Sequence, residues 1–593
     1  MGVQAYSRLA DVPEQVDHAF IMVPEVEQAL EDCAARGVPV ASIYSNGFAD
    51  AGREGAARQA RLIERARSLG VRLLGPNSMG IVNLPGRVAL TVNAVLEMDA
   101  PPAGAISLLS HSGTMLGTVL SRGAARGLGF AKLVSLGNEA DLGVGELLEL
   151  LAADPDTKVI LLFLETVRDA ERLAAAGRKA HAAGKPVVAY KLGRSALGEA
   201  LARTHTGALA GTDRALDAFF RDCGIVRVDM LETLIEIAPL LAGRRPPALK
   251  RKPRVAVVTT TGGGAATVVD RLGLHGIETI APDSASPIVD LTMTATPAQY
   301  TAVLERQLAL PECDGVLAVV GSSAQFHPQL AVEPILAAQP RDKPLAAFLT
   351  PHAERSLALL GSRGIPAFRT PEACADAFAA YFAWRAPRPQ RVWHAPALHA
   401  DAFGLLRSLG IEVVEHAIAE APQYAHSIPY PVALKLCSAH KTELGGVALD
   451  IADRAAFEAQ ARKMSEPRLM VQKMERGLAE AIVGYRDDPV VGPLVLLGAG
   501  GTLAEIHQDF ALRIAPVSEA EAMEMIEEVK GLALIRGYRK LPRGDREALA
   551  RAVAALSKLG LIEGRPIAEA EINPLIVKRE GVIAVDALLA LKE

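Results

Sequence analysis

Short apolar runs alternate with segments of helical period along the first 243 residues. The runs include H-A-F-I-M-V-P, V-A-S-I-Y-S, A-I-S-L-L-S and K-V-I-L-L-F-L-E, and the segments between them are rich in Ala, Leu and Arg. This alternation is typical of βαβ units, whose parallel strands are buried on both faces. It predicts a doubly wound α/β architecture.

Two stretches rich in proline and basic residues, 242–254 and 386–396, interrupt this pattern and are typical of linkers. The pattern also breaks at M-D-A-P-P-A-G, residues 98–104, and it restarts at R-V-A-V-V-T-T-T-G-G-G-A-A, residues 254–266. We therefore predict four domains, which comprise residues 1–99, 100–243, 253–385 and 392–593.

Several predicted strand-to-helix turns carry small or acidic residues where parallel sheets bind ligands. S-H-S-G-T, residues 110–114, is either an anion-binding turn or an ordinary helix N-cap. T-T-G-G-G, residues 260–264, matches neither G-x-G-x-x-G nor a Walker A motif. Glu139, Asp141 and Glu165 lie at other such turns, and each taken alone is typical of a structural residue.

The last block differs in kind from the others. Y-P-V-A-L-K-L predicts a strand that carries Lys435 inside an apolar run, and L-L-G-A-G-G-T-L-A-E predicts a glycine-rich turn. In I-A-E-A-E-I-N-P-L-I-V, residues Glu569, Glu571 and Asn573 alternate with apolar residues and so share one strand face. With Asp586, this face offers the hard oxygen ligands that Mg²⁺ prefers, or else it is a solvated acidic edge.

Composition excludes several classes of function. The chain has 593 residues, of which 50% are apolar, and its formal net charge is -5, with no basic face for nucleic acid. The 5 cysteines are scattered singly, which predicts neither a zinc site nor a disulfide framework. No apolar run approaches the ~18 to 20 residues of a membrane span, so we expect a soluble, cytoplasmic protein with no membrane partner.

Several motifs together resemble one known family. They are K-L-G-R-S (191–195) followed by T-H-T-G-A-L-A-G (204–211), H-K-T-E-L-G-G-V (440–447), G-P-N-S-M-G (75–80), S-N-G-F (45–48), and E-I-N-P-L with V-D-A near the end. The sequence resembles the NDP-forming acyl-CoA synthetases, which include ADP-forming acetyl-CoA synthetase and are related to succinyl-CoA synthetase. The resemblance implies a Rossmann-like CoA-binding domain, two flavodoxin-like doubly wound domains and a C-terminal ATP-grasp domain.

The resemblance also implies roles for individual residues. His205 is the histidine that becomes phosphorylated, His440 passes phosphate to and from the nucleotide, and Glu165 orients or stabilises phospho-His205. The other implied sites are phosphate-binding Ser110, Ser112, Gly113, Thr206 and Gly207; CoA-binding Pro24, Ser45, Gly47, Phe48 and Asn77; nucleotide-binding Lys435, Gln472, Lys473, Met474, Gly500 and Gly501; and Mg²⁺-binding Glu571, Asn573 and Asp586.

The implied reaction converts a carboxylic acid, CoA and ATP into acyl-CoA, ADP and phosphate, reversibly, through acyl phosphate and phosphohistidine. Histidine suits such a relay because neutral imidazole is nucleophilic near neutral pH, and because its phosphoramidate can pass the phosphoryl group in either direction. Related enzymes are commonly oligomeric, so we expect a homo-oligomer. The alternative is a non-catalytic regulatory protein of the same fold that binds nucleotide or acyl-CoA.

Three features depart from the family pattern. The chain begins about where the third strand of the CoA-binding domain is expected, which predicts an N-terminally incomplete domain. C-S-A-H-K, residues 437–441, is shorter than the usual spacing before the His-Lys pair. His111 stands where glutamine is common and Thr166 where glycine is common, and we expect both to reshape the acid pocket.

Overall fold

The structure is a computed structural model that describes residues 4–99, 101–195, 197, 213–281, 286–292, 295–338, 342–437, 446–501 and 509–592. The chain divides into two compact units. The first comprises residues 1–213 and 220–389, and the second comprises residues 214–219 and 390–593. Each unit is described by itself below.

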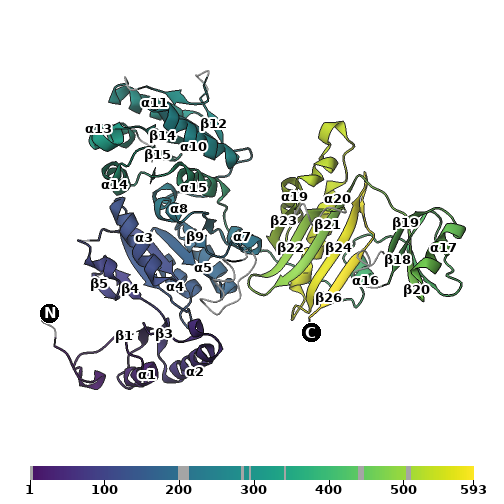
Figure 1. Cartoon of the computed structure of the whole chain (residues 1–593), viewed down its shortest axis with the longest axis horizontal. Helices are drawn as coiled ribbons and strands as arrows, with labels where there is room; N and C mark the ends of the chain where they lie inside the picture. Colours follow the sequence, from purple (N-terminus) through teal and green to yellow (C-terminus); the bar gives the residue numbers. More distant parts are fainter. Residues whose placement is uncertain are drawn as a thin grey trace. The chain divides into compact units, whose positions relative to one another are not determined.

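The first unit opens with a small parallel sheet in the order β1-β2-β3. Its strands are β1 (His18–Ile21), β2 (Val40–Ile43) and β3 (Arg72–Leu74), and its helices are α1 (Val26–Ala35) and α2 (Arg53–Leu69). Figure 1 shows the two helices side by side against this sheet. Their apolar stripes cover the strands, as the βαβ pattern predicts, and bury residues such as Leu30 and Leu62.

The second sheet of this unit has the order β10-β9-β8-β6-β7-β4-β5. Its interior strand β8 (Val159–Leu164) is buried along its whole length, as expected of a parallel strand covered on both faces. β4 and β5 run antiparallel at one edge. The other elements are β4 (Gly80–Asn83), β5 (Val88–Thr91), β6 (Ala103–Ser110), α3 (Gly113–Ala125), β7 (Phe130–Ser135), α4 (Val144–Ala153), α5 (Ala170–Ala182), β9 (Val187–Lys191), β10 (Val226–Arg227), α8 (Leu231–Glu236) and α9 (Ala238–Leu241). Helix α7 (Asp213–Cys223) is divided, because its residues 214–219 belong to the second unit.

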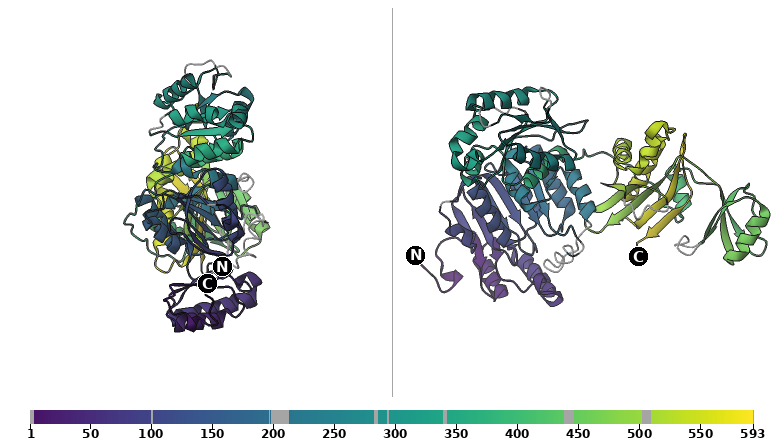
Figure 2. Two further views of the ribbon diagram at one scale, coloured as in Figure 1. Left: turned by 90° about the vertical axis from the view of Figure 1, so that its left-hand side faces the viewer. Right: turned by 45° about the horizontal axis from the view of Figure 1, so that its top comes forward.

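The third sheet has the order β12-β11-β14-β15-β16, with β13 beside β11. Its core lies between helices on both faces, and Figure 2 shows this layering from two further sides. The elements are β11 (Arg254–Thr259), α10 (Gly262–Leu274), β12 (Glu278–Ile280), β13 (Val289–Asp290), α11 (Pro297–Ala309), β14 (Gly315–Val320), α12 (Ser323–Phe326), α13 (Pro328–Ala337), β15 (Leu345–Leu349), α14 (Glu354–Ser362), β16 (Ala367–Phe368) and α15 (Pro371–Ala383). α15 contacts α8, so the second and third sheets share one apolar core.

The second unit contains two antiparallel sheets, ordered β17-β20-β18-β19 and β23-β22-β21-β24-β25, with β26 paired to β24. The elements are α16 (Ala402–Ser408), β17 (His416–Glu420), β18 (Val432–Leu436), β19 (Val447–Ile451), α17 (Arg454–Met464), β20 (Arg468–Lys473), β21 (Ala479–Asp488), β22 (Gly492–Ala499), β23 (Phe510–Ile514), α19 (Glu519–Glu528), α20 (Arg546–Ser557), β24 (Ile567–Val577), β25 (Val582–Ala584) and β26 (Ala587–Leu591). α19 and α20 pack on the larger sheet and bury Ile526 and Val553.

The mixed α/β fold with parallel sheets confirms the predicted fold class for the described residues. One close contact joins the second and third sheets of the first unit. Gly127 follows α3 with φ 73°, and a Cβ atom there would overlap the carbonyl oxygen of Ala358 on α14. The chain can approach α14 this closely because residue 127 has no side chain, and Gly361 on α14 faces the Arg126 carbonyl oxygen in the same way.

We expect Gly127→Ala to destabilise the first unit more than Gly364→Ala does. Both positions have φ 73°, but a Cβ atom at residue 364 meets nothing within 4 Å. Gly364→Ala therefore carries only the left-handed strain of about 1–2 kcal/mol, whereas Gly127→Ala adds an overlap of roughly 1–3 kcal/mol. Thermal unfolding of the two variants measures the difference, and equal midpoints would show that the layers do not depend on this contact.

Candidate functional site

A cavity of about 440 Å³ opens where the carboxyl end of β6 meets the small sheet β1-β2-β3. Its walls include residues from both parts of the first unit: Pro24, Ser45, Asn77, His111, Ser112 and Gly113. Except for His111, each of these residues was predicted to bind CoA or phosphate. The structure therefore places three predicted CoA residues and two predicted phosphate residues around one space.

The start of α3 forms one wall of this cavity. β6 ends at Ser110, whose Oγ donates to the carbonyl oxygen of Ser112 over 2.6 Å. The Ser112 hydroxyl accepts the N–H of Met115 over 3.3 Å, so Ser112 is the N-cap of α3. The two alternatives for S-H-S-G-T are thus compatible, because the turn both caps the helix and lines a cavity. The first N–H groups and the helix dipole make this wall attractive to an anion.

His111 is buried behind this wall, and the protein itself occupies both of its ring nitrogens. Nδ1 accepts the backbone N–H of Glu165 over 2.9 Å, so the ring proton is on Nε2 and is donated to Glu139 Oε2, also over 2.9 Å. The other carboxylate oxygen of Glu139 accepts the N–H of Val144, at the start of α4, over 2.6 Å. His111 therefore fixes the backbone at Glu165 and acts as a positioning residue.

The residues next to Glu165 are also buried. Thr166 is 1% exposed, and its hydroxyl has no hydrogen-bond partner among the described residues. Burial lowers the pKa of Arg168, an effect opposed by Glu139, whose Oε2 lies 4.0 Å from the Arg168 Nε. Glu165 is 6% exposed, and it lies between buried His111 and Thr166 on one side and the more exposed Arg168 on the other.

Two predicted CoA residues, Gly47 and Phe48, are not among the residues that line the cavity. Their N–H groups donate to the two carboxylate oxygens of Asp50, over 3.0 and 3.1 Å. Phe48 is fully buried, and the guanidinium carbon of Arg58 lies 4.5 Å from the centre of its ring. In the structure, these bonds to Asp50 fix the S-N-G-F turn, whose first residue, Ser45, lines the cavity.

Arg58 is a wall residue that sequence reasoning missed. It lines the cavity from α2 and pairs with Glu27 over 2.8 Å. α2 contains several other arginines, and nothing in the local pattern distinguishes Arg58 from them. Only the fold shows which arginine faces the cavity, where it supplies positive charge.

The second unit brings Lys435 and the predicted Mg²⁺ ligands close together. Lys435, from β18, is 5% exposed; its Nζ donates to the Val585 carbonyl oxygen over 2.9 Å and lies 3.4 Å from Asp586 Oδ2. The Asn573 N–H donates to the Asp586 carbonyl oxygen over 3.3 Å, and Asn573 Nδ2 donates to Glu571 Oε1 over 3.1 Å. Residues that are 150 positions apart in sequence therefore meet at one place.

The strand face predicted for Glu569, Glu571 and Asn573 is present on β24. These three side chains are exposed or half-buried, whereas the intervening Ala570 and Ile572 are buried. Within the described ranges, no three His, Cys, Asp or Glu side chains form a metal-binding group. The donor set here is two carboxylates and one amide oxygen, which fits a hard cation such as Mg²⁺.

The predicted nucleotide-binding residues Gln472, Lys473 and Met474 lie at the end of β20. The N–H groups of Lys473 and Met474 donate to the carbonyl oxygens of Glu415 and Pro431, respectively. Both N–H groups therefore have hydrogen-bond partners within the protein. Gln472 is 1% exposed, and its Oε1 has no partner among the described residues. Gly500 and Gly501 follow β22, and the Gly500 N–H donates to the Glu480 carbonyl oxygen over 2.8 Å.

His205, Thr206, Gly207 and His440 lie outside the described residues. The structure does describe residues on either side of the segment 198–212. Arg194 Nε lies 3.6 Å from Asp213 Oδ2, and Arg194 also pairs with Asp229. Asp213 pairs with Arg227 as well, so ion pairs connect the two ends of the segment that contains His205.

No helix in the described part of the chain is long and apolar enough to cross a membrane. Three family descriptions match the chain in succession. A CoA binding domain matches residues 1–83, a succinyl-CoA ligase-like flavodoxin domain matches residues 103–241, and an ATP-grasp domain matches residues 397–591.

Similar proteins match over the full chain. An ADP-forming acetate–CoA ligase from Archaeoglobus fulgidus is 32% identical over 651 residues, covering 100% of this chain and 93% of the relative. A trans-feruloyl-CoA synthase from an unknown prokaryotic organism is 32% identical over 656 residues, covering 100% and 92%. A dinucleotide forming acetyl-coenzyme A synthetase from Ca. Korarchaeum cryptofilum, solved with phosphate and ADP, has a TM-score of 0.55 at 26% identity and covers 65% of this chain and 86% of that one.

We expect Glu139→Gln to be destabilising although the two side chains have the same shape. Glu139 accepts from both His111 and Val144, and glutamine has only one oxygen, so its NH2 group would meet either the His111 Nε2–H or the Val144 N–H. The other tautomer of His111 would bring its Nδ1–H against the Glu165 N–H, so two donors meet in every arrangement. An unsatisfied buried group costs about 1–3 kcal/mol. Glu31→Gln, in an exposed pair with Arg65, is the control and should cost under about 1 kcal/mol. Urea unfolding compares the two variants, and similar losses of stability would contradict the hydrogen bonds assigned to the two Glu139 oxygens.

Proposed function

The chain belongs to the family of ADP-forming acyl-CoA ligases, and we propose that it makes acyl-CoA through a phosphohistidine relay in which His205 is the carrier. The net reaction converts a carboxylic acid, CoA and ATP into acyl-CoA, ADP and phosphate. The observation that carries this proposal is the cavity at the start of α3, where CoA-type and phosphate-type residues meet.

Each step exchanges one bond for another. A histidine nitrogen attacks the γ-phosphorus of ATP and releases ADP, and the phosphoryl group passes by way of His440 to His205. A carboxylate oxygen of the acid then attacks this phosphorus, which forms acyl phosphate and frees the imidazole. Finally the CoA sulfur attacks the acyl carbon, the bond from that carbon to the phosphate oxygen breaks, and the departing phosphate takes the thiol proton. Neutral imidazole serves as both nucleophile and leaving group near neutral pH.

The residues around the first-unit cavity support the last step. The N–H groups at Gly113 and the dipole of α3 would hold the departing phosphate, and Ser45 and Asn77 would hold CoA beside it. Arg58 adds the positive charge that the phosphates of CoA require. His111 cannot donate a proton to substrate while Glu139 and Glu165 occupy its nitrogens. Its proposed role is therefore to hold Glu165 in place.

The second-unit cluster supports nucleotide binding. Lys435 would exchange its contact with Asp586 for the phosphates of ATP, and Asp586, Glu571 and Asn573 would then hold Mg²⁺ through their oxygen atoms. When bound, Mg²⁺ neutralises charge on the phosphate oxygens. The contribution of the protein is to bring a buried cation and three oxygen ligands to the same place.

The relay is tested by incubating the full chain with Mg²⁺ and ATP labelled in its γ-phosphate. We expect phosphate on the protein that is stable in base and labile in acid, as a phosphoramidate is. His205→Ala should lose the stable label, and His275→Ala, which changes an exposed histidine elsewhere in the first unit, should keep it. If the wild type binds ATP but takes no label, the chain is instead a nucleotide-binding protein of this fold.

Lys435→Met tests the nucleotide end. Removing the buried cation should lower kcat/KM for ATP by about 10²–10³ because phosphoryl transfer depends on charge neutralisation. Lys463→Met, on the exposed surface of α17, is the matched control and should change it less than about twofold. Initial rates at varied ATP measure both variants. An unaltered rate in Lys435→Met would place the phosphates elsewhere.

A further inference from the structure

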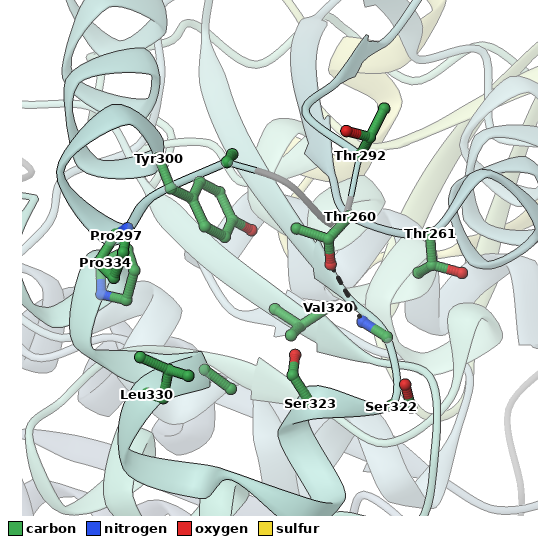
Figure 3. Close-up of a pocket in the computed structure, with 13 residues that line it drawn as sticks. Thr260, Thr261, Thr292, Pro297, Tyr300, Val320, Ser322, Ser323, Leu330 and Pro334 are labelled. Carbon is green, nitrogen blue, oxygen red and sulfur yellow. Dashed lines mark hydrogen bonds between the residues drawn. The ribbon is translucent and has the colours of Figure 1, made fainter.

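A second cavity, of about 270 Å³, lies in the third sheet of the first unit (Figure 3). β11 lies between β12 and β14 in this sheet. The chain therefore adds β12 on one side of β11 and β14 on the other, so the strand order reverses between β11 and β14. In open α/β sheets, ligands bind outside the carboxyl ends of the strands at such a switch point. Thr260 and Thr261 follow β11, Gly321 and Ser322 follow β14, and all four line the cavity.

The two ends of this cavity differ chemically, as Figure 3 shows. Hydroxyl groups gather at one end, where the Gly321 N–H donates to Thr260 Oγ1 over 3.4 Å. α10 begins there with three glycines and has no side-chain cap among the described residues. The other end is walled by Pro297, Leu330 and Pro334. The cavity thus joins a polar end beside a helix N-terminus to an apolar end.

Tyr300 also lines the cavity, and it brings a polar group, its hydroxyl, close to the apolar end. It is 5% exposed, and its hydroxyl has no hydrogen-bond partner among the described residues. Figure 3 shows the ring directed into the cavity, with its oxygen toward Thr260 and Val320. Burial raises the pKa of Tyr300, so the group is a neutral hydroxyl that can donate and accept. A hydroxyl that the protein leaves without a partner, and that faces a cavity, can bond to a hydrogen-bonding group of a ligand.

We propose that this cavity binds the organic part of the substrate acid, and that the acid carries a hydroxyl group on an otherwise apolar tail, where it bonds to Tyr300. This inference rests on the proposed function, since it identifies the acid for that reaction. The carboxylate faces the hydroxyl groups and the N–H groups at the start of α10 while the acid binds and is phosphorylated, and the acyl group then moves to the first cavity, where the CoA sulfur attacks it. Asp290, which accepts the Thr292 N–H over 2.9 Å, is not one of the residues lining the cavity.

The size of the cavity argues against acetate as the best substrate. A water molecule occupies about 30 Å³ in the liquid, so the cavity has room for roughly nine waters. Acetate has only one methyl group beyond its carboxylate and would leave the apolar end empty and Tyr300 without a partner. A tail of several carbon atoms fills the space between the two ends.

The experiment measures kcat/KM of the full chain, with ATP and CoA saturating, for matched pairs of acids. The pairs are butanoate with 4-hydroxybutanoate, and 3-phenylpropanoate with 3-(4-hydroxyphenyl)propanoate, with acetate as reference. We expect the hydroxylated member of one pair to be preferred, and the pair that shows this distinguishes an aliphatic from an aryl tail. Tyr300→Phe should lower kcat/KM about tenfold for that acid and leave its plain partner within about twofold.

Two further variants make the result specific. Tyr485→Phe removes another buried tyrosine hydroxyl that lacks a partner within the described part, and it should leave the ratio between paired acids unchanged. Leu330→Trp changes a side chain that is 54% exposed, so the fold should tolerate it, and it should narrow the cavity in favour of acetate.

The outcomes separate this inference from the proposed function. If acetyl-CoA forms but neither hydroxylated acid is preferred, or if Tyr300→Phe lowers the rate of all acids equally, the inference is wrong and the ligase activity stands. If no acid gives acyl-CoA and the protein takes no phosphate from ATP, the proposed function itself fails. A preference that Tyr300→Phe abolishes and Tyr485→Phe preserves supports the inference.

Discussion

The hydrogen bonds of one loop hold the small sheet β1-β2-β3 against the sheet that contains β6. This loop, residues 136–143, connects β7 to α4, and each of its polar side chains reaches a different partner. Asn138 donates to Asp50 over 2.8 Å, Glu139 accepts from His111, and Asp141 lies 2.9 Å from Arg72. The first cavity lies between the parts joined in this way, so its shape depends on these bonds.

The cavities at the start of α3 and of α10 follow from the same physical constraint. Parallel strands all end at one edge of the sheet, and the helices that follow begin there with unsatisfied N–H groups. At α3, the Ser112 hydroxyl satisfies one of these groups and glycine leaves room beside it. At α10, three glycines begin the helix. A reaction that handles carboxylates and phosphates can therefore use a property that this fold already provides, and the surrounding side chains choose the ligand.

The sequence predicted what depends on local pattern and missed what depends on long-range contact. The buried run of β8, the N-cap at Ser112 and the exposed alternation on β24 were all visible as spacing. Arg58 and Tyr300 were missed because each lies on an amphipathic helix where nothing local shows that it faces a cavity. Glu139 was interpreted as structural, and its bond to His111, 28 residues away, became visible only in the fold. The roles of His205 and His440 rest on motif resemblance.

Two buried tyrosines show why a missing hydrogen bond means different things in different surroundings. Tyr485 is 1% exposed, burial and then Asp487 raise its pKa to about 12, and its ring lies in the core beneath α20. Tyr485 lines neither of the two cavities described above, so its unsatisfied hydroxyl is a cost to stability that other contacts must offset. Tyr300 bears the same cost beside a cavity, where a ligand can supply the missing bond. That cost is recovered only on binding, and so it favours an acid that brings its own hydroxyl over one that does not.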